Sequence, residues 1–232
     1  MRFKTLSPML VAVLALSACS EASQDFHFTY FVPAENKIFY ADQKQDTLHL
    51  VSTDRWTISV SDNWLGVTPT TGQPTGSQVS SDTRLNLVCD PNTTGKVRLS
   101  VINVMTENSV ALPVYQLPWL RVRRPEPLYL NDENQLVNAV EATQMVCSLG
   151  VLSQSEQDSV RVYNYQPGAT LEAAANDWFD KVDTTFQTTG WHTVRFTYRS
   201  NPTAQERETT LTFTSAGVSQ QIVVRQAAKP ED

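Results

Sequence analysis

Residues 47–61, TLHLVSTDRWTISVS, alternate apolar and polar side chains in two short bursts that Thr53-Asp54-Arg55 separates. Alternation with a period of two is typical of β-strands that pack one face inward and leave the other to solvent. Turn residues such as Asp90-Pro91-Asn92 follow these bursts. Many short strands between turns predict a β-sandwich. Similar bursts recur at Leu85/Leu87/Cys89, Val97/Leu99/Val101 and Val110/Leu112/Val114.

The second half of the chain has the same alternation. The Ala-rich run 171–175 is its one hint of a helix, and it predicts a single helical turn inside a connection. Residues 137–152 fit either a helix or a strand, and Val146, Cys147 and Val151 favour the strand. The other bursts lie at Val160/Val162, His192/Val194/Phe196/Tyr198, Leu211/Phe213 and Ile222/Val224.

An internal repeat divides the chain into two halves. A Trp followed by an apolar residue precedes an Asn, and a Gln follows that Asn after 24 residues in the first half and 25 in the second. By length alone, the chain could hold one large β domain or two of about a hundred residues each. The repeat favours two. Its members are Trp64-Leu65, Asn92 and Gln116, and then Trp178-Phe179, Asn201 and Gln226.

The boundary between the halves lies in LPWLRVRRPEP, residues 117–127. This stretch has three prolines, three arginines and no alternation, so it predicts a short, fairly stiff linker in which Trp119 wedges between the domains. The expected organisation is a signal peptide, a lipidated tether, two sandwiches and the linker between them. Their predicted ranges are 1–18, 19–34, 35–117 and 128–228, with the linker at 118–127.

Both halves resemble the BACON family, a Bacteroidetes-associated domain often found beside carbohydrate-active enzymes. In the second half Thr170 stands where the first has Trp56, after a longer leading segment. The resemblance implies two tandem seven-stranded immunoglobulin-like β-sandwich domains that bind carbohydrate or mucin without catalysis, although family members also act as spacers. The matching residues are Trp56, Trp64-Leu65, Pro69, Gly72, Asn92 and Val114-Tyr115-Gln116, and then Trp178-Phe179, NPTAQERETTLTF from Asn201 and IVVRQ from Ile222.

The N-terminus reads as an export signal. Arg2 and Lys4 precede the apolar run 9–18, which is too short to span a membrane but fits the core of a signal peptide. The run ends in Leu-Ser-Ala-Cys19, which resembles the bacterial lipobox and implies an acylated Cys19 that holds the protein on a membrane. The alternative is a secretory peptide cut nearby, with Cys19 incidental.

The predicted location is the outer membrane. Acids after the cysteine, Glu21 and Asp25, favour the cell surface over the periplasmic side. Removing residues 1–18 takes away Arg2 and Lys4 and shifts the formal net charge from −6 to −8. An acidic balance argues against nucleic acid as a partner.

Nothing in the sequence predicts an enzyme, a metal site or a cofactor. The three histidines, His27, His49 and His192, are far apart and lack the ligand spacing of a zinc site. Neither a G-x-S-x-G elbow, a P-loop nor a dinucleotide fingerprint occurs. Cys89 and Cys147 either form a bridge or are small buried strand residues in separate domains, and we favour the second reading.

Aromatic residues provide the candidate ligand site. Tyr163 and Tyr165 share one face of a predicted strand, and Trp191 begins another. Such rings can stack against a sugar, but they also serve ordinary core and edge packing. For Trp64 and Trp178 we expect a core role at the end of each sandwich.

Two functions follow. The first is a non-catalytic envelope lipoprotein that binds glycan or mucin. The second is a structural spacer, or a lipoprotein that assembles with an envelope protein partner. Rings of Tyr163, Tyr165 and Trp191 that are clustered and exposed would favour the first function, and buried rings the second.

Overall fold

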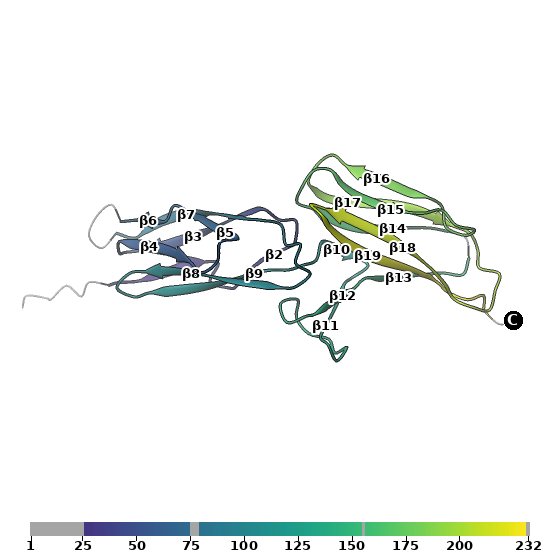
Figure 1. Ribbon diagram of the computed structural model, residues 1–232, viewed down its shortest axis with the longest axis horizontal. Coiled ribbons are helices and arrows are strands. Elements are labelled where there is room, and N and C mark those ends of the chain that lie inside the picture. Colours follow the sequence, from purple (N-terminus) through teal and green to yellow (C-terminus); the bar gives the residue numbers. More distant parts are fainter. Residues whose placement is uncertain (1–25, 75–78, 155, 231–232) are drawn as a thin grey trace, which may run out of the picture.

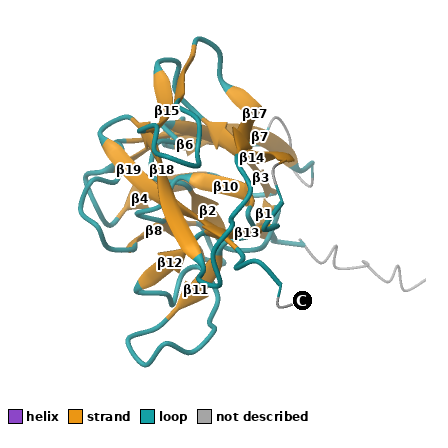
Figure 2. Ribbon diagram, turned by 90° about the vertical axis from the view of Figure 1, so that its right-hand side faces the viewer, coloured by secondary structure: helices purple, strands orange, loops and turns teal. Residues whose placement is uncertain are grey.

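The computed structural model describes residues 26–74, 79–154 and 156–230. Strands and loops make up all of this part of the chain, and no helix occurs in it (Figure 2). Two β-sandwiches lie end to end, and the described chain begins at the outer end of the first and finishes at the outer end of the second (Figure 1). The prediction of an all-β fold with two sandwiches is confirmed. The predicted signal peptide and Cys19 lie outside the described residues, and no described helix is long and apolar enough to cross a membrane.

The first sandwich packs a four-stranded sheet, in the order β1-β3-β7-β5, against a five-stranded sheet, in the order β2-β9-β8-β4-β6. All neighbours are antiparallel except β2 and β9, which run parallel. The strands of the first sheet are β1 (Thr29–Val32), β3 (Gln45–Ser52), β7 (Ser81–Cys89) and β5 (Leu65–Thr68). Those of the second are β2 (Lys37–Phe39), β9 (Val110–Gln116), β8 (Arg98–Met105), β4 (Trp56–Val60) and β6 (Thr71–Gly72).

The alternating residues fill the core of this sandwich. Leu48 and Leu50 on β3 and Leu85 and Leu87 on β7 are almost fully buried, while the residues between them face outward. The indole of Trp56 is buried over β6, where a Cβ on Gly72 would lie only 2.3 Å from the ring. Glycine therefore lets β6 pair closely beside this tryptophan.

The second sandwich packs a three-stranded sheet, β10-β14-β17, against a five-stranded sheet, β13-β19-β18-β15-β16. In both sandwiches the first strand is divided into two parts that belong to different sheets. The second part, β2 or β13, pairs parallel with the last strand of its sandwich, β9 or β19. The strands are β10 (Arg121–Arg124), β14 (Glu156–Asn164), β17 (Gly190–Tyr198), β13 (Ser148–Val151), β19 (Val218–Gln226), β18 (Arg207–Ser215), β15 (Ala169–Ala173) and β16 (Val182–Phe186).

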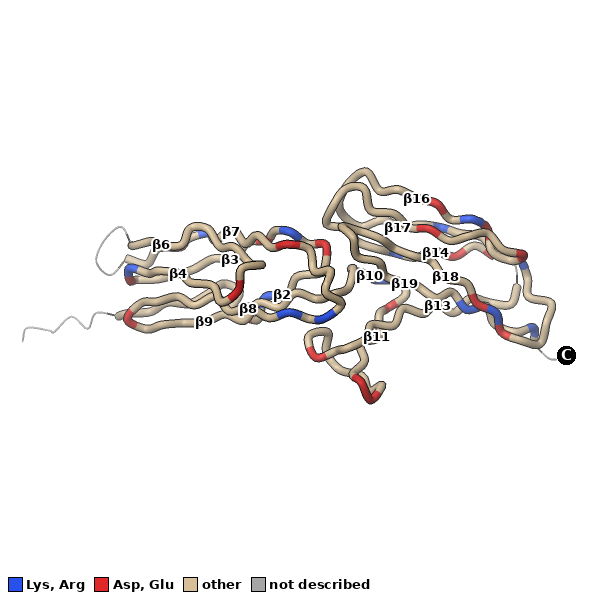
Figure 3. Tube along the Cα trace, viewed as in Figure 1, with Lys and Arg blue, Asp and Glu red and all other residues tan. Residues whose placement is uncertain are grey.

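A hairpin interrupts the split first strand of the second sandwich. Strands β11 (Leu128–Leu130) and β12 (Gln144–Val146) form this two-stranded excursion, which we call the junction hairpin. It projects from the molecule beside the boundary between the sandwiches, and its acidic residues stand at its turns (Figures 1 and 3). Residues 128–147 carry three acids and no Lys or Arg.

Two sequence-based expectations are wrong in detail. Part of the predicted linker, Arg121–Arg124, is strand β10, which pairs with β14 in the second sandwich. The predicted helical turn at 171–175 overlaps β15, because Leu171 is fully buried and β16 and β18 pair with the strand on both sides. This pairing outweighs the local helix propensity of alanine. The strand preference for residues 137–152 is confirmed by β12 and β13, and loop precedes them.

The two cysteines of the body are unpaired. Cys89 belongs to the core of the first sandwich and Cys147 to that of the second, and both are buried free thiols. Burial raises the pKa of each thiol to about 12. The reading of two small buried residues in separate domains is confirmed, with Cys89 on β7 and Cys147 between β12 and β13. At neutral pH both thiols are protonated and unreactive.

Candidate ligand-binding site

The residues of the internal repeat form the same network in both sandwiches. Arg98 Nε donates to Gln116 Oε1 at 2.8 Å, and the Arg98 guanidinium lies 4.5 Å from the centre of the Trp64 ring. Gln116 Nε2 donates to the carbonyl oxygen of Asp90 at 3.0 Å. The equivalents in the second copy are Arg207 Nε to Gln226 Oε1 at 2.9 Å, Arg207 to the Trp178 ring at 4.9 Å, and Gln226 Nε2 to the Arg199 oxygen at 2.9 Å.

The repeated asparagines hold the loop before each arginine. Asn92 Nδ2 donates to the carbonyl oxygens of Lys96 and Gln116, at 2.9 and 3.0 Å. Asn201 Nδ2 donates to those of Gln205 and Ala227, at 2.7 and 3.0 Å. A hydroxyl two residues later, that of Thr94 or Thr203, donates back to the asparagine Oδ1. The shared spacing Asn-x-Thr-x-x-x-Arg was visible in the sequence and signals this loop.

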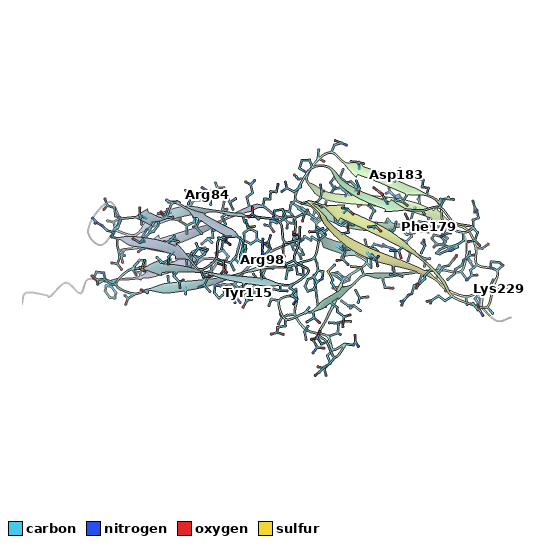
Figure 4. All side chains as sticks on the ribbon, viewed as in Figure 1. Arg84, Arg98, Tyr115, Phe179, Asp183 and Lys229 are labelled. Atoms are coloured by element: carbon cyan, nitrogen blue, oxygen red, sulfur yellow. The ribbon has the colours of Figure 1, made fainter. Side chains whose placement is uncertain are left out.

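These repeat residues are occupied within the fold. Gln116 and Gln226 are fully buried, and their side-chain amides bond neighbouring backbone carbonyls. Trp178 is buried beside Phe179, and Trp64 is half-buried against the first core, which agrees with the expected core role. Arg98 and Phe179 mark the two copies in Figure 4. The ligand site therefore lies elsewhere.

The structure brings Tyr163, Tyr165 and Trp191 together. Tyr163 and Trp191 are direct partners across β14 and β17, with ring centres 5.2 Å apart in an edge-to-face arrangement. The rings of Tyr163 and Tyr165 lie 4.5 Å apart. All three side chains are half-buried, so they are clustered and partly open to solvent.

Three arginines surround this cluster. Arg121 on β10 pairs with Tyr163, so Arg121, Tyr163 and Trp191 form a row across the three-stranded sheet. The guanidinium carbon of Arg121 lies 5.3 Å from the Tyr163 ring centre and 5.1 Å from that of Trp191. Arg161 and Arg123 lie 4.9 and 5.8 Å from the Trp191 ring. At such distances cations are attracted to the aromatic face.

The first sandwich completes the cluster with Tyr40. Its ring stacks on that of Tyr165 at 6.2 Å and 20°, and Arg121 lies 5.4 Å from its centre. Arg121 also donates a 3.1 Å hydrogen bond to the Tyr165 hydroxyl. We call Tyr40, Tyr163, Tyr165 and Trp191 the aromatic cluster. Because its members come from both sandwiches, its geometry depends on the junction between them.

Asp42 fixes that junction. The carboxylate is fully buried, and its Oδ2 accepts hydrogen bonds from the backbone N–H of Tyr165 at 2.9 Å and the hydroxyl of Ser215 at 2.7 Å. Gln166 Nε2 donates to the backbone oxygen of Asp42 at 3.3 Å. The other carboxylate oxygen, Oδ1, has no hydrogen-bond partner among the described residues. Burial raises the pKa of Asp42 above its usual value of 3.8.

Trp119 fills the other side of the junction. The indole is buried within the core of the second sandwich, 5.5 Å from the Tyr129 ring of the junction hairpin. The backbone carbonyl oxygen of Trp119 accepts a 3.0 Å hydrogen bond from the N–H of Ala41, a residue of the first sandwich that belongs to the same core. The predicted wedge between the domains is confirmed.

Two hollows flank the aromatic cluster, and both use residues from the two sandwiches. Their volumes, about 390 and 610 Å³, are within the range of small-molecule sites. The smaller is lined by Tyr40, Arg121, Val122, Arg123, Glu126, Pro127 and Trp191. The larger is lined by Gln43, Lys44, Gln45, Asp46, Tyr163, Tyr165, Gln166, Pro167 and Thr189.

The histidines have structural partners. His27 and His49 contact Asp54 and Asp82 through Nδ1, at 2.5 and 2.7 Å. His192 contacts the carbonyl oxygen of Thr188 and stacks on a phenylalanine. Within residues 26–74, 79–154 and 156–230, no three side chains of the metal-ligating kinds gather into a site. What the cluster offers is stacking, hydrogen bonding and positive charge.

The sequence indicated only part of this site. Tyr40 gave no signal, because it follows a three-residue strand and reaches the site only through the packing of one sandwich on the other. Arg121 and Arg123 lay in the stretch interpreted as a linker. The alternation of Arg161 and Tyr163 along β14 was the available signal for a shared face.

Comparison with solved structures finds distant similarities. A Bacteroides ovatus GH5 xyloglucanase in complex with a XXXG heptasaccharide has 21% identity and a TM-score of 0.34, over 38% of this chain and 18% of that one. The Pseudomonas aeruginosa CupB2 chaperone has 11% identity and a TM-score of 0.30, over 81% and 96%. Tandem Ig domains of titin have 6% identity and a TM-score of 0.26, over 89% and 97%. No curated protein matches the sequence.

A family comparison is more informative. The sequence pattern of BACON, a family described as "Putative binding domain, N-terminal", matches residues 54–117 and 169–227. The first range lies in the first sandwich and the second in the second sandwich, and together they cover more than half of the chain. The chain therefore belongs to the BACON family, with one matching region in each of its two sandwiches.

Proposed function

We propose that this protein is a non-catalytic lipoprotein of the cell envelope that binds glycan, such as mucin carbohydrate, through the aromatic cluster. One observation carries the proposal: Tyr163, Tyr165 and Trp191 are clustered and partly exposed, between two hollows of sugar size. The description of the family as a binding domain supports it.

Recognition rests on stacking and hydrogen bonds. The partly exposed ring of Trp191 can stack on a pyranose ring. The exposed side chain of Gln45 lines the larger hollow and can form hydrogen bonds with sugar hydroxyls. A reversible complex of this kind needs no nucleophile and no acid–base pair.

Replacing Trp191 with alanine is expected to weaken glycan binding by up to about tenfold, because a stacking ring contributes about 0.5–1.5 kcal/mol beyond its buried area. Residues 20–232 without the lipid would be screened on a glycan array, and the affinity for each hit measured by calorimetry. Tyr30→Ala, which truncates an exposed aromatic on β1 of the first sandwich, is the matched control and should bind normally. The proposal fails if no glycan binds the parent protein.

The anchor is proposed at Cys19, on the outer membrane and facing the exterior. The support is the charged start, the apolar run 9–18 and the small residues before the cysteine. Cells grown with a labelled fatty acid should label the parent protein in the membrane fraction, and Cys19→Ala should abolish the label. A labelled Cys19→Ala protein would refute this site of attachment.

A spacer is the second candidate function. It is favoured by the end-to-end sandwiches and by the junction that Trp119 and Asp42 fix, since these hold the two ends of the molecule apart (Figure 1). An envelope protein would then be the partner. The array decides between the two, because a spacer binds no glycan and does not depend on Trp191.

A further inference from the structure

The arginines beside Trp191 lack acidic partners, unlike most others in the second sandwich. Arg124 pairs with Asp158, and Arg225 lies within reach of two glutamates. Arg121, Arg123 and Arg161 form no ion pair with any carboxylate in the described part of the chain. In a protein whose formal net charge is −6, three uncompensated cations around one ring mark a local reversal of charge.

The three guanidinium groups differ in what already holds them. Arg121 lies among the rings of Tyr40, Tyr163 and Trp191 and donates to the Tyr165 hydroxyl. This arginine therefore organises the cluster. Arg123 is exposed and Arg161 half-buried, and no hydrogen bond within the described chain occupies either guanidinium. Their donors remain available to a ligand.

One acid opposes them. Glu126 lines the smaller hollow together with Arg121 and Arg123, and its side chain is exposed. With Arg161 over the same tryptophan ring, three positive charges face one negative charge. A guanidinium binds a carboxylate or sulfate through two parallel hydrogen bonds, a geometry that a neutral hydroxyl cannot match.

We propose that the glycan bound here is acidic: a sugar ring stacks on Trp191 while its carboxylate or sulfate is held by Arg123 and Arg161. This rests on the proposed function, since it names the ligand class of the same site. Arg121 is a positioning residue, because it keeps the four rings together. The recognised chemistry is a pyranose that carries a fixed negative charge.

The test compares matched polysaccharides. Polygalacturonate carries carboxylates, dextran sulfate carries sulfates, and dextran is neutral. Residues 20–232 should bind one or both anionic polymers at least tenfold more tightly than dextran, and the affinity should fall as salt rises. The double variant Arg123→Gln and Arg161→Gln should lose at least tenfold in affinity for the anionic polymer. Comparison of the two anionic polymers identifies the charged group.

The control is Arg84→Gln, which removes an exposed arginine from β7 of the first sandwich and should bind like the parent (Figure 4). Melting curves would verify that every variant is folded. If dextran binds as tightly as the anionic polymers, or if the double variant keeps the affinity of the parent, the proposal of an acidic ligand is overturned. The proposed function then still stands if a neutral glycan binds. If no glycan of any charge binds, the proposed function itself fails. Equally tight binding to a random DNA duplex or to anionic lipid vesicles would overturn recognition of a sugar.

Discussion

Replacing Trp119 with alanine is expected to lower the free energy of unfolding of the second sandwich by about 3 kcal/mol, because truncating a buried tryptophan commonly costs about 3–5 kcal/mol. The indole is 8% exposed and packs in the core of the second sandwich and against Tyr129 of the junction hairpin. We expect a loss at the lower end of this range because Trp119 also lines a pocket of about 530 Å³. The space that the indole leaves would merge with this pocket instead of forming a closed cavity in the core. Scanning calorimetry should show a fall in melting temperature of about 10–20 °C for that domain.

The first sandwich supplies the comparison for this variant. Its core shares no residue with the core around Trp119, to which the first sandwich contributes Ala41, so its own transition should move little. Leu136→Ala, at an exposed position of the junction hairpin, should leave both transitions unchanged. Since Trp119 holds the junction, the variant should also bend more freely, and small-angle scattering should record a broader distribution of shapes. An unchanged melting temperature for Trp119→Ala would contradict the wedge.

Replacing Asp42 with alanine is expected to destabilise the junction by about 2 kcal/mol, because it leaves the N–H of Tyr165 and the hydroxyl of Ser215 without their acceptor. Asp42→Asn keeps one oxygen at the same position and removes the buried charge. The asparagine variant should therefore lie within about 1 kcal/mol of the parent. Urea unfolding of the three proteins measures both differences. An alanine variant as stable as the parent would show that the hydrogen bonds to the Asp42 carboxylate contribute nothing measurable.

The parent protein and Asp42→Asn also allow a test of the pH dependence of stability. Burial raises the pKa of Asp42 above 3.8, so the native state holds this proton more tightly than the unfolded state does. The stabilisation from this proton is complete below pH 3.8 and is lost as the pH rises through the raised native pKa. Relative to Asp42→Asn, the parent should lose stability as the pH increases from about 4. Parallel stability curves for the two proteins would contradict the shift.

Much of the fold followed from local pattern. Alternation places Leu48, Leu50, Leu85 and Leu87 in the core because successive side chains on a strand point to opposite faces. The repeat of Trp, Asn and Gln predicted two sandwiches, because each copy needs these residues to form the same loop and the same Arg–Gln contact. The Ala-rich run at β15, where a helical turn was expected, is a place where pairing on both sides outweighed propensity.

The ligand site divides differently. The sequence alone indicated Tyr163, Tyr165 and Trp191, since aromatic residues on alternating positions of strands signal a shared face. It could not indicate Tyr40, which reaches the cluster only when Asp42 and Trp119 fix one sandwich against the other. Nor could it indicate Arg121, which reaches the cluster because β10 pairs with β14. Tyr40 is 81 or more positions away from Arg121 and Tyr165, and it meets them through domain packing, which no local periodicity encodes. The strands and their faces were thus determined by sequence, while the charge and composite shape of the site were decided by the tertiary structure.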